Sequence, residues 1–180
     1  PGHGLSRRPR FEGSPREQAR QIRAGLEALG IGRAGVVGHS FGGLVALAHA
    51  ELFPDATDYL VLVAPLAFPE WRTLEHSLFA PRAAPVAGPI FAKLAQASFD
   101  RPLLEMVQRR MFSPQPVEPG WKAGFPYAQV LRSDAMVREG EDAAAILPGA
   151  PTGLIDLAAV RAPAFILTGT ADKIVEDERQ

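Results

Sequence analysis

The sequence predicts an α/β fold with a mostly parallel sheet, and three segments carry this prediction. Residues 34–37 form a short apolar run that leads into a glycine-rich turn, and a helical pattern of small and apolar residues follows at once. Residues 59–64 and 164–168 are continuous apolar runs, which are typical of strands covered by helices on both faces. A strand, a helix and a second strand within a few tens of residues predict a right-handed βαβ unit.

Length and composition are ordinary for one folded unit and exclude several classes of function. The chain has 180 residues, of which 47% are hydrophobic, and a net charge of −1. This balance gives no reason to expect a nucleic-acid or membrane partner. The absence of cysteine excludes disulfides, a thiolate nucleophile and zinc–sulfur sites. No apolar run approaches the roughly 18 residues that span a bilayer, and we expect a cytoplasmic protein.

The turn between the first strand and its helix reads Gly38-His39-Ser40-Phe41-Gly42, a Gly-x-Ser-x-Gly pattern. In a nucleophile elbow of this pattern the serine stands at the apex of a sharp, strained turn. We expect that a Cβ atom at Gly38 or Gly42 would crowd the turn. The serine Oγ would then lie over a helix N-terminus, where backbone N–H groups favour developing negative charge. An alternative is a glycine-rich turn of another α/β fold in which Ser40 only caps the helix, although no phosphate-binding glycine pattern is present.

Three motifs, in this order, resemble the α/β-hydrolase fold superfamily of the serine-nucleophile, cap-domain type. Residues 1–6, Pro-Gly-His-Gly-Leu-Ser, resemble the family's Pro-Gly-x-Gly-x-Ser loop, and residues 38–43 resemble its elbow. Residues 166–175 resemble the strand and loop that carry the acid of the catalytic triad. The resemblance implies a partial doubly wound, mostly parallel sheet with a helical cap insertion, and an esterase- or lipase-like activity.

The resemblance also assigns roles to individual residues. Ser40 would be the nucleophile, Asp172 the acid of the triad, and the backbone N–H of Phe41 one donor of the oxyanion hole. Glu176 and Asp177 compete with Asp172 for the acid, but they lie in a charged run that is expected to be exposed. The alternative for Asp172 is a side chain that merely caps a turn.

The general base is not expected among the histidines of this chain. The family order is Ser, acid, His, so the resemblance implies a histidine after Asp172. His39 is expected to point away from Ser40, His49 lies about 13 Å along the helix, His76 falls in the cap region, and His3 is expected to be structural. The second oxyanion donor is implied to precede residue 1. We therefore expect a piece of a longer protein that is inactive by itself.

The rest of the chain divides by composition. Residues 1–65 are expected to form part of the hydrolase core, 66–150 the helical cap and 151–180 a further part of the core. Helices are expected from Pro15 to about Gly30, and in the cap over 102–112 and 127–138. Nine large side chains of the cap are candidates to line an apolar acyl or alcohol pocket, or else to form the cap's own core: Trp71, Phe79, Phe91, Phe99, Met106, Phe112, Trp121, Phe125 and Tyr127.

The sequence therefore predicts a hydrolase that transfers the acyl group of an ester or related carbonyl compound through an acyl-enzyme. The expected partner is a small-molecule, ester-like substrate. No cofactor is expected, and no metal, because the four histidines lack ligand spacing. The alternatives are an acyltransferase or perhydrolase of the same fold, and a non-catalytic binding protein.

Overall fold

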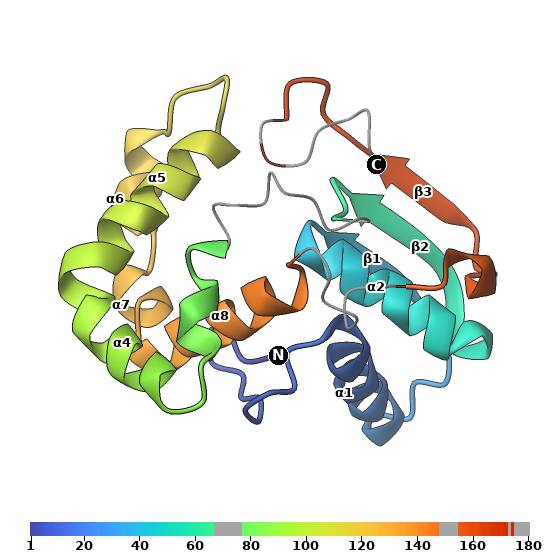
Figure 1. Cartoon of the computed structure of the whole chain (residues 1–180). Helices are drawn as coiled ribbons and strands as arrows, with labels where there is room; N and C mark the ends of the chain where they lie inside the picture. The colour runs from blue at the N-terminus through green and yellow to red at the C-terminus, as the bar shows by residue number, and fades with distance from the viewer. Residues whose placement is uncertain (67–76, 148–154, 173, 175–180) are drawn as a thin grey trace.

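The computed structural model describes residues 1–66, 77–147, 155–172 and 174, and they are built around a three-stranded parallel sheet (Figure 1). The strands are β1 (Ala34–His39), β2 (Thr57–Val63) and β3 (Ala164–Leu167), and β2 lies between the other two. Helix α2 (Phe41–Leu52) connects β1 to β2. The predicted parallel sheet and its βαβ unit are thus confirmed.

One helix covers one face of the sheet, and a second helix packs on the first. Helix α1 (Pro15–Ala28) begins where its sequence predicts, because the Oγ of Ser14 accepts a hydrogen bond of 3.2 Å from the N–H of Glu17. Helix α2 is buried from Gly43 to Ala50 and packs its apolar side chains on Leu60 and Leu62 of β2. Helix α1 packs in turn on α2.

The other face of the sheet is largely exposed in the part of the chain that the structure describes. The register places Val37 of β1 beside Val61 of β2, and Val61 beside Phe165 of β3. Val37 is 69% exposed and Phe165 is 62% exposed. Side chains of a strand alternate between faces, and α2 packs on the face that carries Leu60 and Leu62. The apolar runs alone could not reveal this exposure, because it depends on how elements elsewhere in the chain pack on the described strands.

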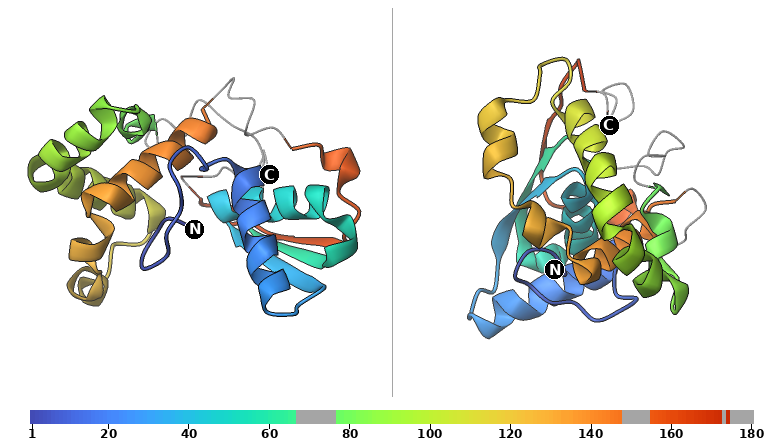
Figure 2. Two further views of the ribbon diagram at one scale, coloured as in Figure 1. Left: turned by 90° about the horizontal axis from the view of Figure 1, so that it is seen from below. Right: turned by 90° about the vertical axis from the view of Figure 1, so that its left-hand side faces the viewer.

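Between β2 and β3 the chain forms a set of short helices that lies apart from the sheet, and we call this set the helical group (Figures 1 and 2). Its members are η3 (Ala80–Ala83), α4 (Ala87–Ala95), the π-helical turn η4 (Gln96–Asp100), α5 (Arg101–Met111), α6 (Pro119–Gly124), α7 (Tyr127–Val130) and α8 (Ser133–Ala145). Two further single turns, η1 (Pro54–Ala56) and η6 (Leu157–Ala159), precede β2 and β3.

Helix α5 confirms the predicted helix over 102–112, whereas the predicted helix over 127–138 is in fact two helices. Arg132 has extended backbone angles, φ −60° and ψ 140°, and therefore separates α7 from α8. Helix α8 then continues to Ala145, well past the predicted end. The proposed boundaries at residues 65 and 150 remain predictions.

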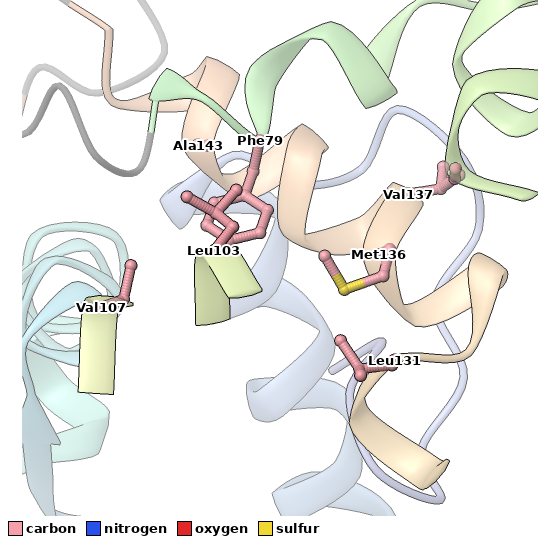
Figure 3. Close-up of a cluster of buried hydrophobic side chains, with 8 residues drawn as sticks. Phe79, Leu103, Val107, Leu131, Met136, Val137 and Ala143 are labelled. Carbon is pink, nitrogen blue, oxygen red and sulfur yellow. The ribbon is translucent and has the colours of Figure 1, made fainter. Parts of the chain in front are cut away.

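The helical group has its own apolar core, drawn in Figure 3. Its buried side chains include Phe79, Leu103, Val107 and Met136. The large side chains of the sequence analysis belong mostly to this group's internal packing, as the alternative interpretation held: Met106 and Tyr127 pack against the core, and Phe112, Trp121, Phe125 and Tyr127 contact one another in series. Trp71 lies outside the described residues.

A buried ion pair stands inside the helical group. Arg82 and Asp100 are both fully buried, and an Arg82 Nη atom contacts the carboxylate of Asp100. The guanidinium lies over the rings of Phe79, Phe91 and Phe99, at 4.9–5.8 Å from their centroids. Burial raises the pKa of Asp100 above its ordinary value, and the charge of Arg82 opposes that rise.

Among the described segments, no helix combines the length and apolar character needed to cross a bilayer.

Candidate active site

Ser40 occupies the bend between the end of β1 and the start of α2. Its backbone has φ 51° and ψ −122°, which lies in a region that non-glycine residues rarely adopt. Three hydrogen bonds hold this conformation: the N–H of Ser40 donates to the carbonyl of Val63 (3.0 Å), and its own carbonyl accepts from Gly43 (2.8 Å) and Leu66 (3.1 Å). The predicted strand–turn–helix geometry is present.

The glycines around Ser40 have unequal roles. A Cβ atom at Gly38 would lie 2.3 Å from the carbonyl oxygen of Gly42, so this position requires glycine. The same expectation is wrong for Gly42, because a Cβ atom there would meet no described atom within 4 Å. Gly43, for which the sequence predicted no steric requirement, is the second position where the backbone is closely approached: a Cβ atom there would lie 2.6 Å from the Cβ of Pro65. The pair Gly42-Gly43 in the sequence did not reveal which of the two glycines lies against the turn after β2.

A cavity of about 300 Å³, which we call the serine cavity, opens beside the elbow. Its lining residues come from the N-terminal loop, α1, the elbow, the end of β2, α8 and the loop after β3: His3, Gln18, Ser40, Phe41, Leu66, Glu139, Asp142, Ala143, Ile146 and Ile174. Phe41 is the first residue of α2, where backbone N–H groups lack an acceptor within the helix. The elbow therefore offers a hydroxyl and a helix N-terminus to one cavity.

The loop that carries Asp172 reaches the same cavity. It follows β3, and parallel strands place their carboxyl ends at one edge of the sheet, the edge at which Ser40 follows β1. The N–H of Asp172 donates to Gly169 (2.9 Å), and its Oδ1 accepts from the N–H of Ile174 (2.8 Å). Ile174, two residues further on, lines the serine cavity. Glu176 and Asp177, the competing acids, lie outside the described residues.

His3 is the described histidine that lines the serine cavity, and its partner is a carboxylate of the helical group. The Nε2 atom of His3 lies 2.8 Å from Oδ2 of Asp142, which is on α8. The other oxygen of Asp142 contacts Arg8 (2.6 Å) and accepts a hydrogen bond from Gln18 (3.0 Å). The hydrogen bond to Asp142 raises the pKa of His3 above 6.5, with a further contribution from Glu139, against the effect of burial.

Sequence reasoning missed this cluster because its members are far apart in the chain. His3 stands 139 residues before Asp142, and no spacing rule connects an N-terminal loop to a helix beyond β2. The Arg8 side chain is fully buried, although the loop over residues 1–13 is rich in glycine, proline and arginine and reads as surface. The sequence signal that could have indicated the cluster is the pair of adjacent acidic residues in α8, Glu141 and Asp142.

Two other described histidines are not among the residues that line the serine cavity. His49 is buried on α2, and its Nδ1 atom lies 2.9 Å from the hydroxyl of Thr57, at the opposite end of β2 from Ser40. Burial lowers the pKa of His49. His39 is exposed at the end of β1 and pairs in register with Val63. His76 lies outside the described residues.

Sequence and structure comparisons relate the chain to a known family and fold. The family model described as "Alpha/beta hydrolase family" matches residues 1–180, the whole chain. The chain belongs to the alpha/beta hydrolase family. Its fold resembles that of MGS-M2, an alpha/beta hydrolase enzyme from a Medee basin deep-sea metagenome library. The TM-score is 0.70 at 18% identity, over 98% of this chain and 62% of that one.

Two curated human proteins resemble the chain in sequence over shorter stretches. The 1-acylglycerol-3-phosphate O-acyltransferase ABHD5 is 37% identical over 73 residues, which are 38% of this chain and 21% of that protein. The (lyso)-N-acylphosphatidylethanolamine lipase is 36% identical over 86 residues, which are 46% of this chain and 25% of that protein. The matched stretches thus span only about a fifth to a quarter of these relatives.

Proposed function

We propose that the protein containing this chain is a serine hydrolase that cleaves an ester or related carbonyl bond through an acyl-enzyme. Ser40 is the nucleophile, the N–H of Phe41 is one donor of the oxyanion hole, and Asp172 is the carboxylate that orients the general base. The order Ser, acid, His of serine hydrolases with this fold supports a histidine after Asp172 as that base.

The strained backbone of Ser40 is the observation that carries the proposal. A non-glycine residue with φ near +51° costs on the order of 1–3 kcal/mol, and such strain persists where the surroundings impose it. Here the hydrogen bonds to Val63, Gly43 and Leu66 impose it. The result is a hydroxyl at the tip of a bend and in the wall of a cavity, where a nucleophile has to stand.

The proposed reaction uses these groups in order. The base takes the hydroxyl proton as the Oγ of Ser40 attacks the substrate carbonyl carbon, and the negative charge moves to the carbonyl oxygen. The N–H of Phe41 and the dipole of α2 stabilise that oxyanion. The base returns the proton to the leaving alcohol as the C–O bond breaks, and water then attacks the acyl-enzyme by the same steps in reverse.

Acyl transfer to an alcohol is the second candidate, because one of the relatives is named as an O-acyltransferase. Both reactions share the acyl-enzyme and differ only in the acceptor. A perhydrolase would differ in the same way, with peroxide as acceptor. Product analysis in water with added glycerol distinguishes these activities, since an acyltransferase forms acylglycerol at the expense of free acid. A non-catalytic binding protein would form no acyl-enzyme at all.

Turnover of p-nitrophenyl acetate by the full-length protein tests the proposal. Removal of the nucleophile in a serine hydrolase lowers kcat by about 10⁴-fold or more, so Ser40→Ala is expected to abolish measurable turnover. Ser98→Ala is the matched control, because Ser98 is exposed in η4 of the helical group. Asp172→Asn is expected to lower kcat with little change in KM. Full activity of Ser40→Ala would refute the proposal.

A further inference from the structure

A second cavity, of about 230 Å³, lies next to the serine cavity and extends into the helical group. Six apolar side chains make up most of its wall: Phe79, Leu104, Val107, Met111, Val130 and Met136. His3 and Glu139 line both cavities and so mark the place where they adjoin. We call the second cavity the distal chamber.

One stripe of α8 runs along both cavities. Met136 lines the distal chamber, Glu139 lines both, and Ala143 and Ile146 line the serine cavity. These residues are three or four positions apart and therefore share one side of a helix. At 1.5 Å per residue the stripe from Met136 to Ile146 is about 15 Å long. The two cavities are therefore consecutive along α8, with Ser40 at one of them.

The chemistry of the distal chamber restricts its occupant. Of its described lining residues, only His3 and Glu139 carry polar side chains, and both stand at the junction with the serine cavity. The imidazole of His3 is already engaged by Asp142. A polar occupant such as a sugar or a nucleotide would lose its hydrogen bonds to water without replacement, which is costly. A hydrocarbon chain forms no hydrogen bonds with water and therefore loses none when it enters the chamber.

From this arrangement, and given the proposed function at Ser40, we infer that the distal chamber holds the tail of a medium-chain acyl group whose carbonyl lies at Ser40. A methylene occupies about the volume of one water molecule, roughly 30 Å³, so 230 Å³ accommodates about seven or eight carbons. With the first carbons in the serine cavity, the preferred acyl group has about eight to twelve carbons.

Leu104 offers the sharpest test, because it lines the chamber from α5 and is only partly buried. Leu104→Trp in the full-length protein would fill part of the chamber, and Leu94→Trp is the matched control on α4, where Leu94 is 75% exposed. The readout is kcat/KM for p-nitrophenyl decanoate relative to p-nitrophenyl acetate. Each buried methylene is worth about fourfold in binding, so exclusion of two or more should lower this ratio by about tenfold or more.

Leu104→Trp is thus expected to lower the decanoate-to-acetate ratio of kcat/KM, whereas Leu94→Trp is expected to leave that ratio unchanged. An unchanged ratio, with acetate turnover still dependent on Ser40, would overturn the chamber assignment and leave the proposed function intact. Decyl acetate serves as a second substrate. A loss confined to decyl acetate would place the alcohol, not the acyl tail, in the chamber and would overturn the inference.

A binding measurement separates the chamber from catalysis. Calorimetric titration of sodium decanoate into the Ser40→Ala variant is expected to show saturable binding that Leu104→Trp weakens about tenfold, while acetate shows none. If neither ester is turned over but this binding is found, the proposed function fails and the chamber stands. If decanoate does not bind, or binds equally to the Leu104→Trp form, the chamber assignment fails.

Discussion

The Nε2 atom of His3 lies 2.8 Å from Oδ2 of Asp142, and this contact joins the N-terminal loop to helix α8 across the wall of the serine cavity. The loop lies between the sheet and the helical group in the left view of Figure 2. Arg8 and Gln18 hold the other oxygen of Asp142. Four side chains from three segments thus fix α8 beside the elbow, although their pairing with Asp142 was not identified from the sequence.

The stability contribution of His3 should depend on pH. Because Asp142 raises the pKa of His3 in the folded protein, the contribution is fully present below pH 6.5 and is lost as the pH rises through the raised value. The side chain is 45% exposed, so the pair is worth no more than a surface ion pair. The substitution His3→Gln should lower Tm at pH 6 by about 1–3 °C more than it lowers Tm at pH 8.

His39→Gln is the control for this measurement, because His39 is exposed on the strand end and does not line the serine cavity. His49, whose pKa is lowered by burial, contributes in the opposite sense in every variant and cancels in the difference. If His3→Gln lowered Tm equally at both pH values, protonation of His3 would make no contribution to stability.

The two glycines of the Gly-x-Ser-x-Gly pattern should respond differently to alanine. Gly38→Ala is expected to destabilise the protein by about 2–3 kcal/mol, because the new Cβ atom would lie 2.3 Å from a backbone oxygen that cannot move freely. Gly42→Ala has no such contact among the described residues and should change the free energy of unfolding by less than about 1 kcal/mol. Urea unfolding of both variants checks this order, which equal losses would contradict.

The buried pair of Arg82 and Asp100 should be costly to break from one side only. Arg82→Met leaves the carboxylate of Asp100 buried without its cation, and about 3–5 kcal/mol of stability should be lost. The double variant Arg82→Met with Asp100→Leu should recover most of that loss, since no charge then remains buried. Thermal unfolding of the two variants compares them, and a double variant less stable than Arg82→Met would refute this interpretation.

The exposed sheet face should make the 180-residue chain self-associate when it is produced alone. Val37, Val61 and Phe165 form an apolar row across this face, and Phe165 lies on β3, an edge strand of the described sheet. Phe165→Lys should therefore shift size-exclusion profiles toward the monomer. Leu94→Lys, at an equally exposed position on α4, should not. A monomeric wild-type chain at micromolar concentration would contradict the prediction.

Local signals made much of the fold predictable. Ser14 and Pro15 determine the start of α1, and the apolar runs after Arg33 and after Pro163 become β1 and β3 because strands of a parallel sheet are apolar throughout. The same runs could not tell how many faces are covered, since that depends on elements elsewhere. Arg132 breaks the helix predicted over 127–138 without a proline or glycine to signal it.

The candidate site was predictable only where one short segment builds it. The positive φ of Ser40 and the close approach at Gly38 follow from the local pattern of glycines. The pairing of His3 with Asp142 depends on long-range packing, and so does the cavity lined by Glu139 and Ile174. The contact of Gly43 with Pro65 was hidden for the same reason, because it arises between α2 and the turn after β2.

Covalent labelling of the full-length protein tests the central claim most directly. A fluorophosphonate reacts with an activated serine, and peptide mapping by mass spectrometry locates the adduct. The account predicts one adduct, on Ser40, and none in Ser40→Ala. An adduct on a different serine, or no adduct on the folded wild-type protein, would contradict the assignment of Ser40 as the nucleophile.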